Sequence, residues 1–236
     1  MRGTLYTQRT GKGDRLLAKA GYTEIRWHGR GGQGAKTAAL LLAEAAAEAG
    51  LHVQGFPEYG PERMGAPVLA FNRISPDPIR LHCHVQNPDV VAVLDPTLLG
   101  RTDDTAAAGR GVDGTAAAAA AGGVDGITAG LRRSGVVVVN SGEDPSLLRE
   151  RLGLGRRPRL RVATVDAGGI SLKALGQAIP NTPMVAAVIR LTDLLDFDRF
   201  LDVAARLLQL KFGRNPHLVD GNLKAMERAY REVREG

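Results

Sequence analysis

The segment 24–49, EIRWHGRGGQGAKTAALLLAEAAAEA, decides the fold of this 236-residue chain. Its first five residues alternate polar and apolar side chains, a pattern that predicts a β-strand. A glycine-rich turn, 29–34, follows at once, and residues 35–49 are mostly alanine and leucine, which favour a helix. Residues 51–56 have the pattern of a strand again, so this part of the chain predicts a β-α-β unit with a right-handed crossover.

The rest of the chain continues this alternation. Further strands are expected at 68–74, 79–84, 89–94, 136–140 and 159–165, the first two as a pair, and further helices at 145–152, 170–178, from 183 onward, 197–212 and 222–233. Helices interleaved with buried strands predict an α/β fold. We expect a three-layer α/β/α domain with a mostly parallel sheet and a helical C-terminal third.

Two segments differ from the predicted domain. Residues 1–23 form a basic N-terminal extension, and residues 101–130 are an Ala/Gly-rich insertion without a clear hydrophobic period. The expected organisation is therefore one domain, 24–236, that carries an extension before it and an insertion within it.

Composition excludes several classes of protein. The single cysteine, Cys83, rules out a disulfide framework, a zinc finger and an iron–sulfur cluster held by this chain alone. The chain has no apolar run long enough for a membrane span and no signal-peptide pattern, so the expected location is the cytoplasm. Aromatic residues make up only 4% of the chain, which disfavours nucleic-acid binding.

The net charge of +6 is concentrated in two places. Residues 1–30 contain seven Lys/Arg and two Asp/Glu, and residues 149–161 contain six Arg and one Glu. Either cluster could attract an anionic cofactor or the acidic face of a partner, or could simply be solvated surface.

The glycine turn is the main candidate site. Its glycines 29, 31 and 34 fit G-x-G-x-x-G between a strand and a helix, an arrangement in which helix N–H groups can bind an anion. The second strand lacks the acidic residue of a dinucleotide site, and Ala35 stands where a Walker A loop has lysine. A turn that merely packs helix against strand remains the alternative. The candidate anion-binding residues are Gly29, Arg30, Gly31, Gly32, Gln33, Gly34 and Lys36.

The Pro/Gly-rich loop 57–67 is the second candidate. It follows the end of a strand, where loops of open α/β sheets often line sites. Arg63 could bind an anion or a partner's carboxylate there, or could pair with Glu58 or Glu62.

Other residues have a functional and a structural interpretation. His28 adjoins the glycine turn and either contacts a phosphate or positions the turn. His82 and His84 share one face of the predicted strand 79–84, but without further ligands a metal site is disfavoured, and Cys83 is expected in the core. Asn181-Thr182-Pro183 predicts a helix start with a capping threonine, with a place at a cofactor's edge as the alternative.

Four motifs in this order resemble the gamma subunit, or gamma domain, of pyruvate:ferredoxin oxidoreductase and other 2-oxoacid:acceptor oxidoreductases. They are GRGGQG at 29–34, GFPEYGPERMGAPVLAFNRIS at 55–75, NPDVVAVLDPTLL at 87–99 and IPNTPM at 179–184. The resemblance covers residues 24–100 closely and 135–235 more loosely.

The resemblance implies oxidative decarboxylation of a 2-oxoacid, most closely pyruvate, to acyl-CoA, CO2 and reduced ferredoxin. Thiamine diphosphate, Mg and iron–sulfur clusters belong to partner subunits in this family, namely alpha, beta and, in many members, delta. A gamma-type chain would dock on them, help to hold coenzyme A and be inactive alone. The glycine turn, with Arg30 and Lys36, suits the phosphates of coenzyme A. The alternative is a stand-alone nucleotide- or CoA-binding regulatory module without redox chemistry.

Overall fold

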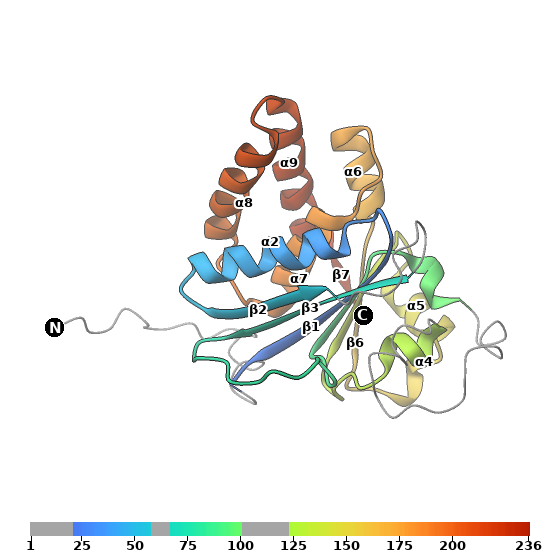
Figure 1. Cartoon of the computed structure of the whole chain (residues 1–236). Helices are drawn as coiled ribbons and strands as arrows, with labels where there is room; N and C mark the ends of the chain where they lie inside the picture. The colour runs from blue at the N-terminus through green and yellow to red at the C-terminus, as the bar shows by residue number, and fades with distance from the viewer. Residues whose placement is uncertain (1–20, 58–66, 101–122) are drawn as a thin grey trace.

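The computed structural model describes residues 21–57, 67–100 and 123–236 (Figure 1). Most of the predicted N-terminal extension, 1–23, and most of the Ala/Gly-rich insertion, 101–130, lie outside these ranges. Arg63 and its loop also lie outside the described residues.

A seven-stranded sheet in the order β2-β3-β1-β4-β5-β6-β7 forms the middle of the domain. The strands are β1 (Thr23–Arg30), β2 (His52–Pro57), β3 (Pro67–Ser75), β4 (Val90–Val93), β5 (Val136–Asn140), β6 (Arg161–Val165) and β7 (Arg234–Glu235). β1, β4, β5 and β6 are parallel neighbours, whereas β3 and β7 pair antiparallel. The predicted α/β fold is confirmed, with a mixed sheet whose centre is parallel.

The predicted strand 79–84 is wrong. β3 pairs with β1 along one side and with β2 along the other, so neither edge of β3 is open to the segment that follows it. Residues 78–86 instead run without regular structure, and Cys83 is exposed rather than in the core.

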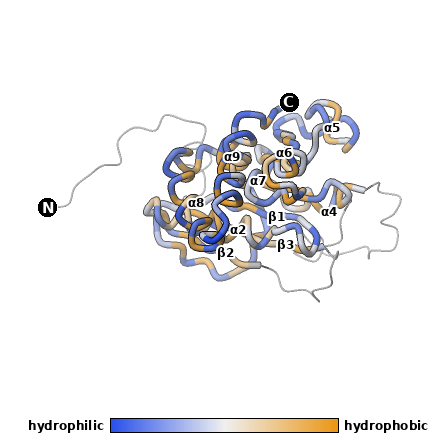
Figure 2. The backbone as a smooth tube through the Cα atoms, turned by 90° about the horizontal axis from the view of Figure 1, so that it is seen from above, coloured by the Kyte–Doolittle hydropathy of each residue, from blue (hydrophilic) through white to orange (hydrophobic). Residues whose placement is uncertain are grey.

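The helices cover both faces of the sheet (Figure 1). α2 (Ala35–Glu48), α6 (Ala167–Leu175), α7 (Asn181–Thr192), α8 (Phe197–Phe212) and α9 (Pro216–Glu232) pack with one large apolar cluster. The 3-10 helices η1 (Pro96–Leu99) and η3 (Leu154–Arg156) and the helices α4 (Gly123–Thr128) and α5 (Pro145–Arg151) cover the other face with a second cluster. Hydrophilic and hydrophobic residues alternate along α8 and α9, as amphipathic surface helices require (Figure 2).

The predicted helix start at 181–183 is confirmed, but the prediction that threonine caps the helix is wrong. α7 begins at Asn181, but Thr182 already lies within the helix and is buried. Its hydroxyl donates to Oδ1 of Asn222 in α9 at 2.9 Å instead of capping α7. The threonine therefore joins two helices.

Charged side chains are buried where β1 and β3 pair. Nη2 of Arg73 lies 2.6 Å from Oε1 of Glu24, and both side chains are almost fully buried. Arg73 also donates to the side-chain oxygen of Gln54 and to the carbonyl oxygen of Cys83. One arginine thus connects β1, β2 and the irregular segment after β3.

Candidate functional site

The glycine turn lies at the point in the sheet from which successive strands are added in opposite directions. The chain leaves β1 through α2 toward β2 on one side, and it leaves β4 toward β5 on the other. In open α/β sheets, ligands bind at the carboxyl ends of strands beside such a switch point. The ends of β1 and β4 therefore form the candidate site of this domain.

The structure requires glycine at different positions of the turn for different reasons. A Cβ atom at Gly29 would lie 3.3 Å from Cβ of Ala35, so this glycine lets α2 pack closely on β1. Gly32 and Gly34 have φ angles of 93° and 82°, which favour glycine. A Cβ at Gly32 would meet nothing within 4 Å, whereas one at Gly34 would lie 2.6 Å from Nδ2 of Asn181. The tip of the turn is open, and its end is covered by α7.

A network of side chains holds the turn against the end of β4. Oε1 of Gln33 accepts the backbone N–H of Arg30 at 2.7 Å, and its amide nitrogen donates to Oδ2 of Asp95 at 2.7 Å. The Arg30 guanidinium lies 3.2 Å from the same carboxylate and also donates to the hydroxyl of Thr97. The conformation of the turn therefore depends on a residue that follows a different strand.

The network favours the ionised form of Asp95. Partial burial opposes its charge, but hydrogen bonds from Thr97 and Gln33, together with the positive charge of Arg30, hold the pKa of the carboxyl below its usual value. The carboxylate also caps η1 by accepting the backbone N–H of Thr97 at 2.9 Å. Its negative charge offsets that of Arg30, so Arg30 contributes less positive charge to the site than the sequence alone suggests.

The N-terminus of α2 has no side-chain cap. Gly34 is the N-cap residue in a left-handed conformation, and no side chain accepts a hydrogen bond there. The first turn contains no acidic residue, and Lys36 is exposed in it. A 14-residue helix with this N-terminus presents N–H groups and partial positive charge to an anion.

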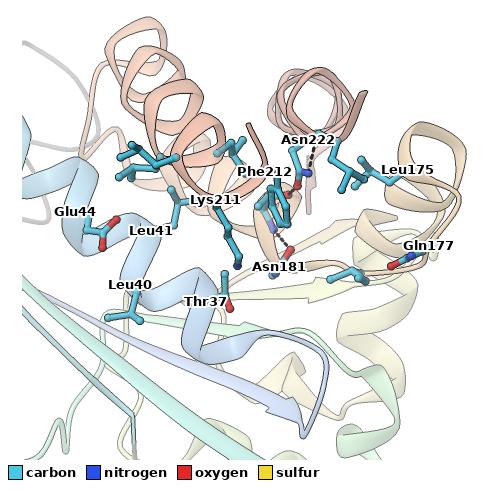
Figure 3. Close-up of a pocket in the computed structure, with 16 residues that line it drawn as sticks. Thr37, Leu40, Leu41, Glu44, Leu175, Gln177, Asn181, Lys211, Phe212 and Asn222 are labelled. Carbon is cyan, nitrogen blue, oxygen red and sulfur yellow. Dashed lines mark hydrogen bonds between the residues drawn. The ribbon is translucent and has the colours of Figure 1, made fainter. Parts of the chain in front are cut away.

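A cavity of about 660 Å³ borders the same region. Asn181, whose side chain packs on Gly34, forms part of its wall together with Thr37 of α2. The Lys211 side chain extends from α8 toward these two residues (Figure 3). Most of the remaining wall is apolar and comes from α2, α8 and α9; it includes Leu40, which is 40% exposed, and Leu210, which is 85% exposed. The cavity can accept an apolar group that carries a polar end.

His28 does not reach the surface of the site. It is buried, and burial together with the nearby Arg26 charge lowers its pKa well below the ordinary value. Its Nε2 accepts a hydrogen bond from Nε of Arg26 at 3.0 Å. Of the two interpretations of His28, the structure supports positioning of the strand that leads into the turn.

The structure brings most of the predicted site residues together. Gly29, Arg30, Gly31, Gly32, Gln33, Gly34 and Lys36 form one turn and the first residues of one helix. Asp95 was not predicted from the sequence as the anchor of this turn. Asn181 was given a site role only as an alternative to helix capping. The sequence does hold signals for both: Asp95 directly follows a predicted buried strand, and Asn181 lies in the motif at 179–184.

Two further findings concern the described residues. Within them, no group of three or more His, Cys, Asp or Glu side chains could hold a metal ion. None of the helices in the same ranges combines the length and the apolar character needed to cross a membrane.

Comparisons with known proteins give a consistent result. Residues 24–232 match the family model for pyruvate ferredoxin/flavodoxin oxidoreductase. Pyruvate synthase subunit PorC of Thermotoga maritima is 40% identical over 215 residues, which cover 90% of this chain and 95% of that protein. The pyruvate/ketoisovalerate oxidoreductases common subunit gamma of Thermococcus kodakarensis is 38% identical over 210 residues, covering 89% and 96%.

A solved structure agrees with these relatives. The crystal structure of pyruvate oxidoreductase subunit PORC from Thermotoga maritima has a TM-score of 0.70 to this chain and 37% sequence identity. The match covers 91% of this chain and 98% of that one.

Proposed function

The chain belongs to the pyruvate ferredoxin/flavodoxin oxidoreductase family as a gamma-type subunit, and from that premise we propose how it serves the enzyme. The reaction is the oxidative decarboxylation of a 2-oxoacid with coenzyme A, which yields acyl-CoA, CO2 and reduced ferredoxin. In our proposal, the chain is a scaffold for the catalytic subunits and binds part of coenzyme A at the glycine turn.

The observation that carries this proposal is the uncapped N-terminus of α2 beside an open glycine turn. Coenzyme A carries a pyrophosphate and a 3′-phosphate, and such groups bind well to free helix N–H groups. Gly32 adds open space at the tip of the turn, and Lys36 adds a positive charge in the first helical turn. The Gln33–Asp95 hydrogen bond keeps this surface in one conformation before the ligand arrives.

The reaction itself needs groups that other subunits supply. Thiamine diphosphate provides the carbanion chemistry of decarboxylation, and iron–sulfur clusters carry the electrons. We assign both to the alpha, beta and, where present, delta subunits, in keeping with the family resemblance. For the clusters, the single cysteine of this chain, Cys83, supports the assignment, because clusters need several cysteine ligands. This chain's residues bind and orient coenzyme A and hold the subunits together, and on its own the chain is inactive.

The proposed 2-oxoacid is pyruvate, the substrate in the names of the relatives described above. The Thermococcus relative is described as a subunit common to pyruvate and ketoisovalerate oxidoreductases. A subunit shared by two enzymes cannot itself choose between their substrates. We therefore place the choice of 2-oxoacid in the other subunits.

The alternative, a stand-alone regulatory module, finds no support. The relatives are named as subunits of oxidoreductases, and the similarity runs over nearly the whole length of each. A gamma-type subunit accounts for the same fold and the same glycine turn.

The test is the affinity of the assembled enzyme for coenzyme A. Lys36→Ala should raise the KM for coenzyme A about three- to tenfold, the usual effect of losing one charge-assisted contact to phosphate. Arg30→Ala should raise the same KM by a smaller factor, because Asp95 already offsets the charge of Arg30. The KM for pyruvate and the recovery of the other subunits should not change. Lys224→Ala, on the exposed surface of α9, is the matched control. An unchanged KM for coenzyme A in both Lys36→Ala and Arg30→Ala would place the cofactor elsewhere.

A further inference from the structure

Arginine residues are concentrated at the end of the sheet opposite the glycine turn, where the parallel strands begin. Two loops lie there: 131–135, which leads into β5, and 156–160, which leads into β6. They contain five arginines, namely Arg132, Arg133, Arg156, Arg157 and Arg159, and no acidic residue. We name this surface the arginine edge.

Two of the five arginines build the edge. Arg157 donates to the carbonyl oxygen of Leu131 at 2.8 Å and so ties the two loops to each other. Arg132 lies 3.1 Å from the carboxylate of Asp89, a buried residue just before β4. Arg149 of α5 adds a hydrogen bond to the carbonyl oxygen of Leu160. The loops are therefore held in place from several directions.

The other three arginines are available for a partner. Arg133, Arg156 and Arg159 are exposed, and none of them forms an ion pair within the ranges that the structure describes. Two other arginines of the cluster noted in the sequence differ in this respect: Arg151 pairs with Glu143, and Arg161 pairs with Glu235. Three uncompensated charges on fixed loops create a positive field that attracts and orients an acidic surface.

The chemistry of the edge favours a protein partner over single-stranded nucleic acid. Residues 131–161 contain no aromatic side chain on which a base could stack, so single-stranded nucleic acid lacks its usual contact. Leu131 and Leu160 of the two loops are buried, as is Leu154 of η3, so the surface offers charge rather than apolar side chains. The guanidinium group matches a carboxylate in two parallel hydrogen bonds.

We propose that the arginine edge binds the acidic face of another subunit of the same oxidoreductase. This inference rests on the proposed function, because it requires the chain to work inside a complex. The two ends of the sheet would then have different functions. The carboxyl ends of the strands would face coenzyme A, and the amino ends of β5 and β6 would bind a neighbouring subunit.

The experiment uses the tagged chain co-produced with the alpha, beta and delta subunits. Arg133→Glu, Arg156→Glu and Arg159→Glu are combined in one variant, and Arg199→Glu, Arg214→Glu and Arg231→Glu, three exposed arginines elsewhere, form the charge-matched control. Affinity between the tagged chain and the remaining subunits should fall about ten- to a hundredfold in the first variant, and not in the control, at an ionic strength of about 0.05 M. Wild-type assembly should also weaken as salt rises, and the variant should show less of this dependence.

Each other outcome has a defined meaning. Equal affinity of wild type and edge variant at low salt overturns the proposal while leaving the proposed function intact. Unchanged assembly with a higher KM for ferredoxin would assign the edge to the electron carrier and also reject the subunit as occupant. If the wild-type chain fails to assemble with the other subunits at all, the proposed function fails first. Circular dichroism of both variants checks that the fold is retained.

Discussion

The amide nitrogen of Gln33 lies 2.7 Å from Oδ2 of Asp95, so a residue of the glycine turn after β1 is fixed to the first polar residue after β4. The same glutamine accepts the backbone N–H of Arg30 with its other side-chain atom. The oxygen and the nitrogen of the Gln33 side-chain amide therefore both hold the turn in its conformation. This relationship makes the affinity for coenzyme A depend on residues that need not touch it.

Replacement of Gln33 by Ala tests that dependence. Loss of both hydrogen bonds leaves the turn free to move and leaves Asp95 with fewer donors. We expect the KM for coenzyme A in the assembled enzyme to rise about five- to tenfold, equivalent to about 1.0–1.4 kcal/mol, with little change in the KM for pyruvate. Gln86→Ala, at an exposed position away from the site, serves as the comparison. Equal KM values in the two variants would argue that the turn keeps its shape without Gln33.

Replacement of Gly34 by Ala tests the contact between the turn and α7. The new Cβ would require a left-handed backbone with a φ of 82° and would meet Nδ2 of Asn181 at 2.6 Å. We expect a loss of about 2–3 kcal/mol in the free energy of unfolding, measured by chemical denaturation.

Two further variants separate the causes of that loss. Gly32→Ala has a similar φ of 93° but open space around it, so it should lose only about 1 kcal/mol. Adding Asn181→Ala to Gly34→Ala should recover part of the loss, because it removes the Nδ2 and Cγ atoms of Asn181 and leaves only its Cβ, at 3.0 Å. A double variant no more stable than Gly34→Ala would show that backbone conformation accounts for the whole effect.

Asp89 gives a prediction about pH. Burial raises the pKa of its carboxyl to about 6, against the stabilising hydrogen bond from the backbone of Glu24 and the charge of Arg132. The folded protein then keeps a proton that the unfolded chain, with an ordinary pKa of 3.8, has already lost. Stability contributed by this group is therefore lost as pH rises from about 4 through about 6, by up to about 3 kcal/mol.

The variant Asp89→Asn isolates this contribution. The amide cannot ionise, and its oxygen can still accept the backbone N–H of Glu24. The free energy of unfolding of the wild type, relative to Asp89→Asn, should decrease between about pH 4 and pH 7. Parallel stability curves for the two proteins over this range would contradict the assignment.

The buried ion pair between Glu24 and Arg73 should be costly to break from one side. Glu24→Gln leaves the arginine charge buried without its counter-ion, and we expect a loss of about 3–5 kcal/mol in the free energy of unfolding. The double variant Glu24→Gln and Arg73→Met removes the charge as well. It should be more stable than Glu24→Gln alone, as measured in the same denaturation series. The reverse order would indicate that the contacts of Arg73 with Gln54 and Cys83 outweigh its charge.

Local sequence patterns predicted most helices and strands, but they did not predict which strands pair with each other. The helix expected at 197–212 has the same bounds in the structure, since an apolar face at helical spacing is a property of adjacent residues. The place of β3 between β1 and β2 depends on pairing between distant residues, such as Trp27 with Ala70. Single-segment patterns contain no information about that pairing, and the wrong strand at 79–84 follows from this.

The candidate site divides in the same way. The glycine spacing predicted the turn, because its backbone needs are local. Asp95 lies 62 residues beyond Gln33, and Asn181 reaches Gly34 from the third helix of the same face. These contacts arise when strands β1 and β4 become neighbours and α7 packs on α2, which sequence spacing alone does not express.

The position of β3 has a consequence for how the chain folds. Residues 23–75 contain β1, α2, β2 and β3, which contact one another extensively. These four elements can therefore fold together as a local unit before β4 has formed. The parallel half of the sheet must then be added to the free edge of β1, through longer loop closures. We expect this early unit to be the folding nucleus, so that substitutions in β3 slow refolding while those in α9 mainly accelerate unfolding.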